Sequence, residues 1–225
     1  MRLTYPGLNI EFNLSETEPV VIVLEKPEIF SDFIENIWNQ TNGREGCFIL
    51  GNADKVLCLD KKLALIMNPF AISSNDRKIL SKIYTELSIV TTESYYEELA
   101  ALNTAIINAL DKMMEKLPYP LTSKFELDLI SLFKTYDIKI EEEDNGLLER
   151  VVSYLKLNHQ VCGIEVFVFV NLKQYLEKEQ LQELYKAAAY EQVYIINIEG
   201  RDGKERLKEE RCIIIDKDLC IIDLM

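Results

Sequence analysis

The sequence predicts an α/β protein, in which a discontinuous head domain with a mainly parallel sheet is interrupted by an inserted all-helical leg domain. Continuous apolar, β-branched runs lie near both ends of the chain, and such runs are typical of strands covered on both faces. Between them, over residues 75–156, apolar residues recur with the 3.6-residue period of helices. A strand, a helix and a second strand then follow within 164–198, an order that implies a parallel pair of strands.

The first 70 residues predict several strands and one helix. Residues 20–24 form the first strand, and Pro27 opens a helix over 27–39, since proline is favoured at the first helical position. Three short strands are expected next, with Gly51-Asn52 as the turn between the first two: 47–50, 56–59 and 63–67.

The middle of the chain predicts four helices. The first covers 75–90, and the second, over 92–117, has apolar residues in alternating steps of four and three, the spacing of a helix that pairs with another helix. Pro118 ends this second helix. Two shorter helices follow, the last capped by Asp144 or Asn145: 124–136 and 145–156.

The C-terminal part returns to α/β. Residues 164–171 are the strongest strand of the sequence, followed by a helix over 177–190 and a strand over 193–198. The turn Asp216-Lys217-Asp218 then joins a hairpin of two strands, 212–215 and 219–222.

These elements divide the chain into two domains. The α/β head is expected to comprise residues 1–70 and 158–225, and the helical leg insertion residues 71–157. No internal repeat is visible in the sequence.

Composition narrows the class of protein. Lys and Arg number 25 and Asp and Glu 38, so the formal charge is −13, and 48% of the residues are hydrophobic, as in a globular chain. There is no apolar run long enough for a membrane span and no apolar segment of an export signal at the start. We therefore expect a cytoplasmic protein without a membrane contact.

Cysteine and histidine point away from a zinc site. The five cysteines lack the close spacing of metal ligands, and we expect them to be small buried side chains. The single histidine, His159, is expected in a turn, and one histidine cannot support a His-rich metal site.

The phosphate-binding motifs are missing. No G-x-x-x-x-G-K-[ST] and no G-x-G-x-x-G occurs, although a phosphate loop needs consecutive backbone N–H groups to surround the anion. Instead, Glu25-Lys26-Pro27-Glu28 follows the first strong strand, where proline removes an N–H group and two carboxylates repel phosphate. We expect no nucleotide cofactor.

Acidic and basic groups supply the remaining candidates. The run Glu141-Glu142-Glu143-Asp144 is either a solvated loop next to a helix start or an oxygen-rich calcium site. Glu126 and Asp128 are similarly ambiguous. Two pairs of bases lie in the predicted helical insert, and each pair alone is typical of a solvated helix surface: Lys78 with Lys82, and Lys134 with Lys139.

The order of the elements resembles a known family. The stretches that carry the resemblance are Val20-Val21-Ile22-Val23-Leu24-Glu25, Asn75 with Ile79 and Leu80, Lys134 through Ile138-Lys139-Ile140-Glu141, and Val166-Phe167-Val168-Phe169-Val170-Asn171. In this order and spacing the chain resembles the short form of the type II-A CRISPR-associated adaptation protein, the ring-forming subunit of spacer acquisition that binds double-stranded DNA ends.

The resemblance implies a function that composition does not. It implies a head similar to a degenerate P-loop ATPase, a homotetrameric ring around double-stranded DNA, and no catalytic activity. It also implies partnership with the CRISPR integrase and the RNA-guided effector nuclease in adaptive antiviral defence. The implied DNA contacts are Lys134 and Lys139, which match basic positions of the family, and we add Lys78 and Lys82.

Calcium is the point at which the sequence departs from the family. Family members carry several acids just before the third leg helix, whereas this chain has Pro120-Leu121-Thr122-Ser123-Lys124 and keeps only Glu126 as a metal-ligand candidate. Calcium binding is thus an open expectation, and Lys124 is a possible electrostatic substitute.

Two other classes of function stay open. The chain is alternatively an acidic protein-interaction scaffold that assembles through residues 92–117 without binding DNA. It is otherwise a metal-dependent phosphoesterase that uses Glu126 or Asp128.

Overall fold

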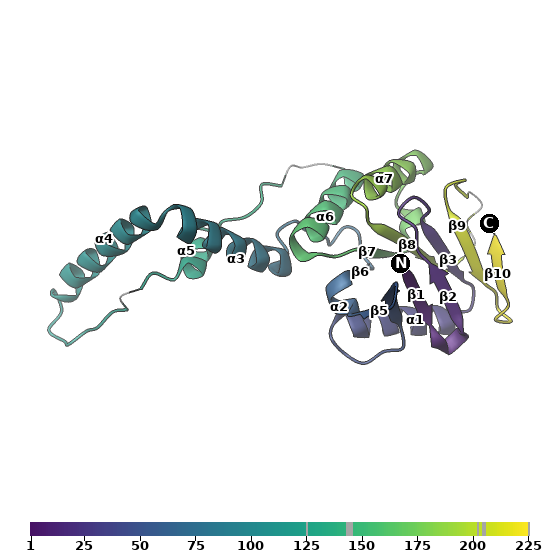
Figure 1. Ribbon diagram of the computed structural model, residues 1–225, viewed down its shortest axis with the longest axis horizontal. Helices are drawn as coiled ribbons and strands as arrows, with labels where there is room; N and C mark the ends of the chain where they lie inside the picture. The colour runs from purple at the N-terminus through teal and green to yellow at the C-terminus, as the bar shows by residue number, and fades with distance from the viewer. Residues whose placement is uncertain (125, 143–145, 202, 204–205, 225) are drawn as a thin grey trace. The chain divides into compact units, whose positions relative to one another are not determined.

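The computed structural model describes residues 1–124, 126–142, 146–201, 203 and 206–224 (Figure 1). Its contacts divide the chain into two compact units. Unit 1 comprises Met1–Ser74 and Glu142–Met225, and unit 2 comprises Asn75–Glu141. Unit 1 is an α/β structure with two sheets, and unit 2 contains helices α3, α4 and α5.

A six-stranded sheet forms the centre of unit 1, in the order β10-β9-β3-β8-β7-β6. The pairs within β9-β3-β8-β7-β6 are parallel, and only the pair β9–β10 is antiparallel. The strands are β3 (Val20–Leu24), β6 (Leu63–Ile66), β7 (Val166–Val170), β8 (Tyr194–Glu199), β9 (Arg211–Ile215) and β10 (Ile221–Leu224). The expected mainly parallel α/β sheet is therefore present.

A second, antiparallel sheet has the order β2-β1-β4-β5. Its strands are β1 (Arg2–Tyr5), β2 (Ile10–Asn13), β4 (Ile49–Asn52) and β5 (Lys55–Leu57), and the short helix η1 (Pro6–Leu8) joins the first two. The sequence predicts no strand in residues 1–18. Leu3, Tyr5, Ile10 and Phe12 are the buried members of the alternating pattern in β1 and β2.

The two faces of the central sheet have separate cores. On one face, α1 (Pro27–Thr41) and the second sheet enclose side chains such as Phe33, Ile22 and Ile196. On the other face, α6 (Leu147–Cys162) and α7 (Lys178–Tyr190) pack on β7 and β8 through Val151, Leu184 and others. The remaining short helices of unit 1 are α2 (Leu59–Lys62) and η2 (Leu172–Gln174).

Helix α6 differs from the sequence prediction in position and length. The predicted boundary at residue 157 placed most of it in the insertion, but Leu148, Val151 and Leu155 are buried in the core of unit 1. The helix continues to Gly163, whose φ of 69° ends it. His159 is therefore part of helix α6, near its C-terminus, and not part of a connecting turn as expected. Its Nδ1 is 2.8 Å from the carbonyl oxygen of Ile164. The expected cap at Asp144 or Asn145 lies outside the described residues.

Two smaller expectations in unit 1 were wrong. Gly51 and Asn52 belong to β4, and the turn is Ala53-Asp54, because the register that pairs Leu50 with Leu57 directs both side chains to the core. Of the cysteines, only Cys212 is buried; Cys162 is half-buried, and the others are exposed: Cys47, Cys58 and Cys220.

Unit 2 consists of α3 (Arg77–Ser94), α4 (Tyr96–Met114) and α5 (Leu129–Thr135). Helix α3 ends four residues later than predicted, since the hydroxyls of Thr91 and Thr92 donate to carbonyls of the preceding turn and fit within the helix. Helix α5 is shorter than predicted because Asp128 caps it, accepting the N–H of Ile130 at 3.1 Å. None of the described helices is both long and apolar enough to cross a membrane.

Candidate nucleic-acid interface

Helices α3 and α5 pack against each other around a small core in unit 2. Ile79, Tyr84 and Phe133 are its buried side chains, and the rings of Tyr84 and Phe133 lie 6.1 Å apart. This pairing joins the first turns of α3 to a helix that begins about 50 residues later in the chain. The elements carrying the four predicted lysines therefore form one packed piece.

The segment after α5 is held against α3 by hydrogen bonds. The Tyr84 hydroxyl donates to the Ile138 carbonyl at 2.6 Å. Asn75, just before α3, uses both atoms of its amide: its Nδ2 donates to the Ile140 carbonyl at 2.9 Å, and its Oδ1 accepts the Ile140 N–H at 2.8 Å. Residues 138–140 thus run beside the stretch that contains Lys78 and Lys82.

All four lysines are exposed on this packed piece. Lys78 and Lys82 are one turn apart on α3, and Lys134 is in the last turn of α5. Lys139 forms an ion pair with Asp137 at 2.6 Å. The side chains of this pair are 55% and 77% exposed, so water and salt screen it.

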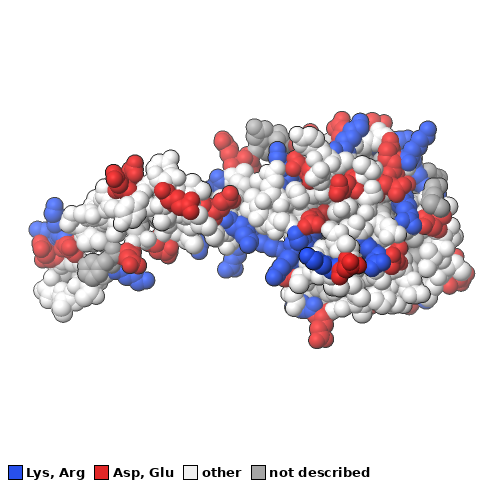
Figure 2. Space-filling view, in the orientation of Figure 1, with Lys and Arg blue, Asp and Glu red and all other residues white. Residues whose placement is uncertain are grey.

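Charge is unevenly distributed along unit 2. Residues 75–84 and 129–141 carry five bases against three acids, whereas the remainder of unit 2 carries three bases against eight acids. Figure 2 shows basic side chains over the first turns of α3 and acidic side chains farther along the helix on the visible face. We call residues 75–84 and 129–141 the α3–α5 piece. It is a net positive part of an acidic protein, whereas the rest of α3 adds Glu86 and Glu93 and the cap of α5 adds Asp128.

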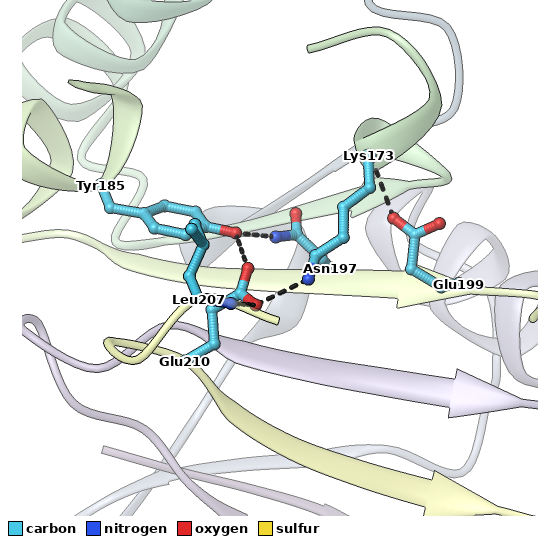
Figure 3. Close-up of polar contacts among 6 residues, drawn as sticks. All are labelled: Lys173, Tyr185, Asn197, Glu199, Leu207 and Glu210. Carbon is cyan, nitrogen blue, oxygen red and sulfur yellow. Dashed lines mark hydrogen bonds and ion pairs between the residues drawn. The ribbon is translucent and has the colours of Figure 1, made fainter. Parts of the chain in front are cut away.

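A separate polar cluster is buried in unit 1 (Figure 3). Glu210, just before β9, accepts hydrogen bonds from the Tyr185 hydroxyl at 2.6 Å, from the Lys173 ammonium at 2.6 Å and from the Leu207 N–H at 3.2 Å. Asn197 donates through Nδ2 to the Tyr185 oxygen at 2.6 Å. The cluster links η2, α7, β8 and the start of β9.

Its ionisable groups are fixed by these contacts. Burial, followed by the charge of Glu210, raises the pKa of Tyr185, so the hydroxyl stays protonated and donates. Burial also raises the pKa of Glu199, whose carboxylate accepts the Lys173 N–H at 3.1 Å. Within the described part of the chain, the Oδ1 of Asn197 is buried without a hydrogen-bond partner. The cluster is organised to hold elements together.

The family model described as CRISPR-associated protein (Cas_Csn2) matches residues 40–219, which is most of the chain. The chain belongs to the Cas_Csn2 family. A CRISPR-associated protein Csn2 from Streptococcus agalactiae is 23% identical over 228 residues, covering 99% of this chain and 97% of that protein. Membership in the Cas_Csn2 family supports a role in CRISPR adaptation and confirms the resemblance found in the sequence.

One solved structure shows a distant likeness. It is described as an ABC transporter ATP-binding protein from Pyrococcus furiosus, with a TM-score of 0.37 and 12% identity, and the match covers 91% of this chain and 88% of that one. At this level the likeness carries no argument about fold or function.

The predicted calcium ligands do not belong to a cluster of ligands within the described residues. Glu126 is exposed, and the Asp128 carboxylate is engaged by Ile130 N–H and the Ser131 hydroxyl, contacts that lower its pKa. Across the described ranges, no three Asp, Glu, His or Cys side chains converge in a way that could hold a metal ion. Glu143 and Asp144, half of the acidic run considered above, lie outside those ranges.

The sequence indicates the lysines of this Cas_Csn2 chain but not the hydrogen bonds that join the segments carrying them. The sequence marks Asn75 only as part of the resemblance and does not single out Tyr84. A polar tip on a buried tyrosine is a general signal of a hydrogen bond, but its partner, Ile138, is 54 residues away.

Proposed function

We propose that this Cas_Csn2 chain is a non-catalytic protein that binds double-stranded DNA without sequence preference, as a homotetrameric ring, during spacer acquisition. The observation that carries the proposal is the net positive α3–α5 piece of unit 2 in a chain whose total charge is −13. Integrase and RNA-guided nuclease are its proposed partners in adaptation.

The chemistry of the surface favours phosphate contacts. Its candidate groups are lysines, which bind phosphate oxygens as point charges. Contacts of this kind position a protein on DNA and carry no sequence information. A non-specific binder that neutralises about 6–10 phosphates loses affinity steeply as salt rises, and four copies of four lysines supply enough bases for that number.

The net charge makes assembly necessary for this function. Four chains carry −52, which is four times −13, so no long-range attraction draws the protein to DNA. Binding then depends on bringing the positive pieces of several chains to one inner surface.

Helix α4 supports assembly. It has no buried residue, and several of its apolar side chains are exposed, with Leu102 at 43%, Leu110 at 39% and Met113 at 66%. These positions keep the alternating spacing of paired helices. An apolar stripe of this length is costly to leave in water, and a second copy of the helix would cover it.

The head supports a role without nucleotide chemistry. Helix α1 follows β3, the place of a phosphate loop in P-loop ATPases, yet it begins with Lys26 as its cap, Pro27 as its first residue and Glu28 in its first turn. This start lacks the glycine-rich run of N–H donors that a phosphate requires. We infer a degenerate relative of the ATPase fold that acts as a scaffold.

DNA-binding measurements test the proposal. Fluorescence anisotropy with a labelled linear duplex at low salt should show binding that weakens as salt rises and is equal for unrelated sequences. The double variant Lys134→Glu/Lys139→Glu should lower affinity at least tenfold on every sequence, because two phosphate contacts become repulsive.

A matched control separates surface from net charge. Lys112→Glu/Lys116→Glu makes the same change of charge in unit 2, outside the α3–α5 piece, and should have a much smaller effect. Absence of binding to linear duplex at low salt, with and without calcium, would contradict the proposed function. An equal loss of DNA affinity in the two double variants would show that the contact surface lies elsewhere.

A further inference from the structure

Lys139 lies between two residues whose backbones are hydrogen-bonded to α3 or to the residue just before its cap. The Ile138 carbonyl accepts from Tyr84, and both backbone groups of Ile140 pair with the Asn75 amide. Ile138 also donates its N–H to the Phe133 carbonyl at 3.0 Å, at the end of α5. The segment 138–140 is therefore joined to both helices that carry the other lysines.

These bonds set the register of the segment along α3. An amide that pairs with both the N–H and the carbonyl of one residue copies the pairing of a strand, and so permits a single alignment. Tyr84, in turn, rests with its ring against Phe133, and a helical side chain leans toward the N-terminus of its helix. Together Asn75 and Tyr84 act as a clip at the two ends of a three-residue segment.

We propose that Asn75 and Tyr84 are positioning residues that hold Lys139 in register with Lys78 and Lys82, so that the lysines meet the phosphates of one duplex together. This inference rests on the proposed DNA binding. It assigns a role to two residues that do not themselves contact the DNA.

The alternative is that the clip only stabilises unit 2. The two roles predict different relations between Tyr84 and Lys139 in DNA binding. A positioning role makes the contribution of Lys139 depend on Tyr84, whereas a stabilising role lowers the folded fraction without changing which lysines contact DNA.

A double-mutant cycle distinguishes them. Tyr84→Phe keeps the ring and removes only the donor to Ile138. DNA affinity is measured by anisotropy over a range of salt concentrations for the wild type, Tyr84→Phe, Lys139→Gln and the combined variant. Thermal unfolding of each protein gives its folded fraction.

The positioning role predicts that Tyr84→Phe lowers the slope of log affinity against log salt by about one for each chain of the ring that contacts the duplex, since each such chain loses roughly one phosphate contact. The measurement is made at a temperature where the protein is folded. Lys139→Gln should lower the slope equally, and the combined variant should lose no more than either single one. Asn75→Ser, which shortens the amide clamp, should reproduce the effect. The control Tyr96→Phe, at a residue that is 72% exposed, should leave the slope unchanged.

Two failures can be told apart. If the wild type binds no duplex, the proposed function falls and this inference with it. If the wild type binds and Tyr84→Phe leaves the slope unchanged, or its loss adds fully to that of Lys139→Gln, only the positioning role is overturned.

Discussion

At the scale of single residues, the ion pair of Lys139 with Asp137 bears directly on DNA binding. The Asp137 carboxylate is 2.6 Å from the Lys139 ammonium. This ammonium is the group that we propose binds a DNA phosphate. Asp137 also has a positive φ of 49°, a conformation that asparagine adopts as readily as aspartate. The carboxylate therefore competes with DNA, and its charge is separable from its backbone role.

Asp137→Asn should strengthen DNA binding. The variant keeps the turn and removes a negative charge beside Lys139, so affinity should rise about two- to fivefold at low salt, the scale of an exposed ion pair of ~0.5–1 kcal/mol. Anisotropy with linear duplex measures this. Asp111→Asn changes the charge equally on α4 and should have a smaller effect. An equal rise in both variants would show that only total charge matters.

At the scale of elements, the sequence predicts best what depends on neighbours along the chain. The apolar runs of β3 and β7 and the periodicity of α3 identified these elements, because a fully buried strand and a one-sided helix leave plain patterns. Helix boundaries were predicted less accurately where a single residue decides them, as Asp128 does for the start of α5 and Gly163 for the end of α6.

Pairings over long distances were not predictable in this way. The strands β1 and β2 are short, and their alternation of buried and exposed residues depends on the pairing of β1 with β4, which lies far along the chain. The candidate site shows the same division. The lysines were visible as charges, but the register of Lys139 beside α3 depends on the amide of Asn75, which is 65 residues from Ile140.

The buried cluster of unit 1 joins several elements and should be costly to disturb. Tyr185→Phe removes the hydroxyl that donates to Glu210 and accepts from Asn197. The buried Asn197 amide then loses its hydrogen bond, and the Glu210 carboxylate keeps only Lys173 and the Leu207 N–H. The free energy of unfolding should fall by about 1–3 kcal/mol, measured by urea denaturation. Tyr190→Phe, on the same helix at a residue that is 86% exposed, should leave it unchanged. Equal stabilities would mean that water replaces the lost bonds.

At the scale of the whole molecule, most of the negative charge belongs to unit 1. It holds 27 carboxylates and 17 bases, whereas unit 2 holds 11 and 8. Unit 2 also exposes the apolar stripe of α4. The unit with less negative charge thus carries both the candidate DNA surface and the candidate assembly surface, which makes the two functions interdependent.

Breaking the α4 stripe should therefore abolish assembly and DNA binding together. Leu102→Glu/Leu110→Glu places two charges in the stripe, so the solution mass measured by ultracentrifugation should fall below that of a tetramer. Affinity for linear duplex should fall more than tenfold, because fewer lysines reach one DNA molecule at once. The control Thr104→Glu/Asn108→Glu adds the same charge on the opposite face of α4 and should keep both properties. A variant that loses assembly yet binds DNA with unchanged affinity and salt dependence would show that a single chain suffices, and the ring would then have no part in DNA binding.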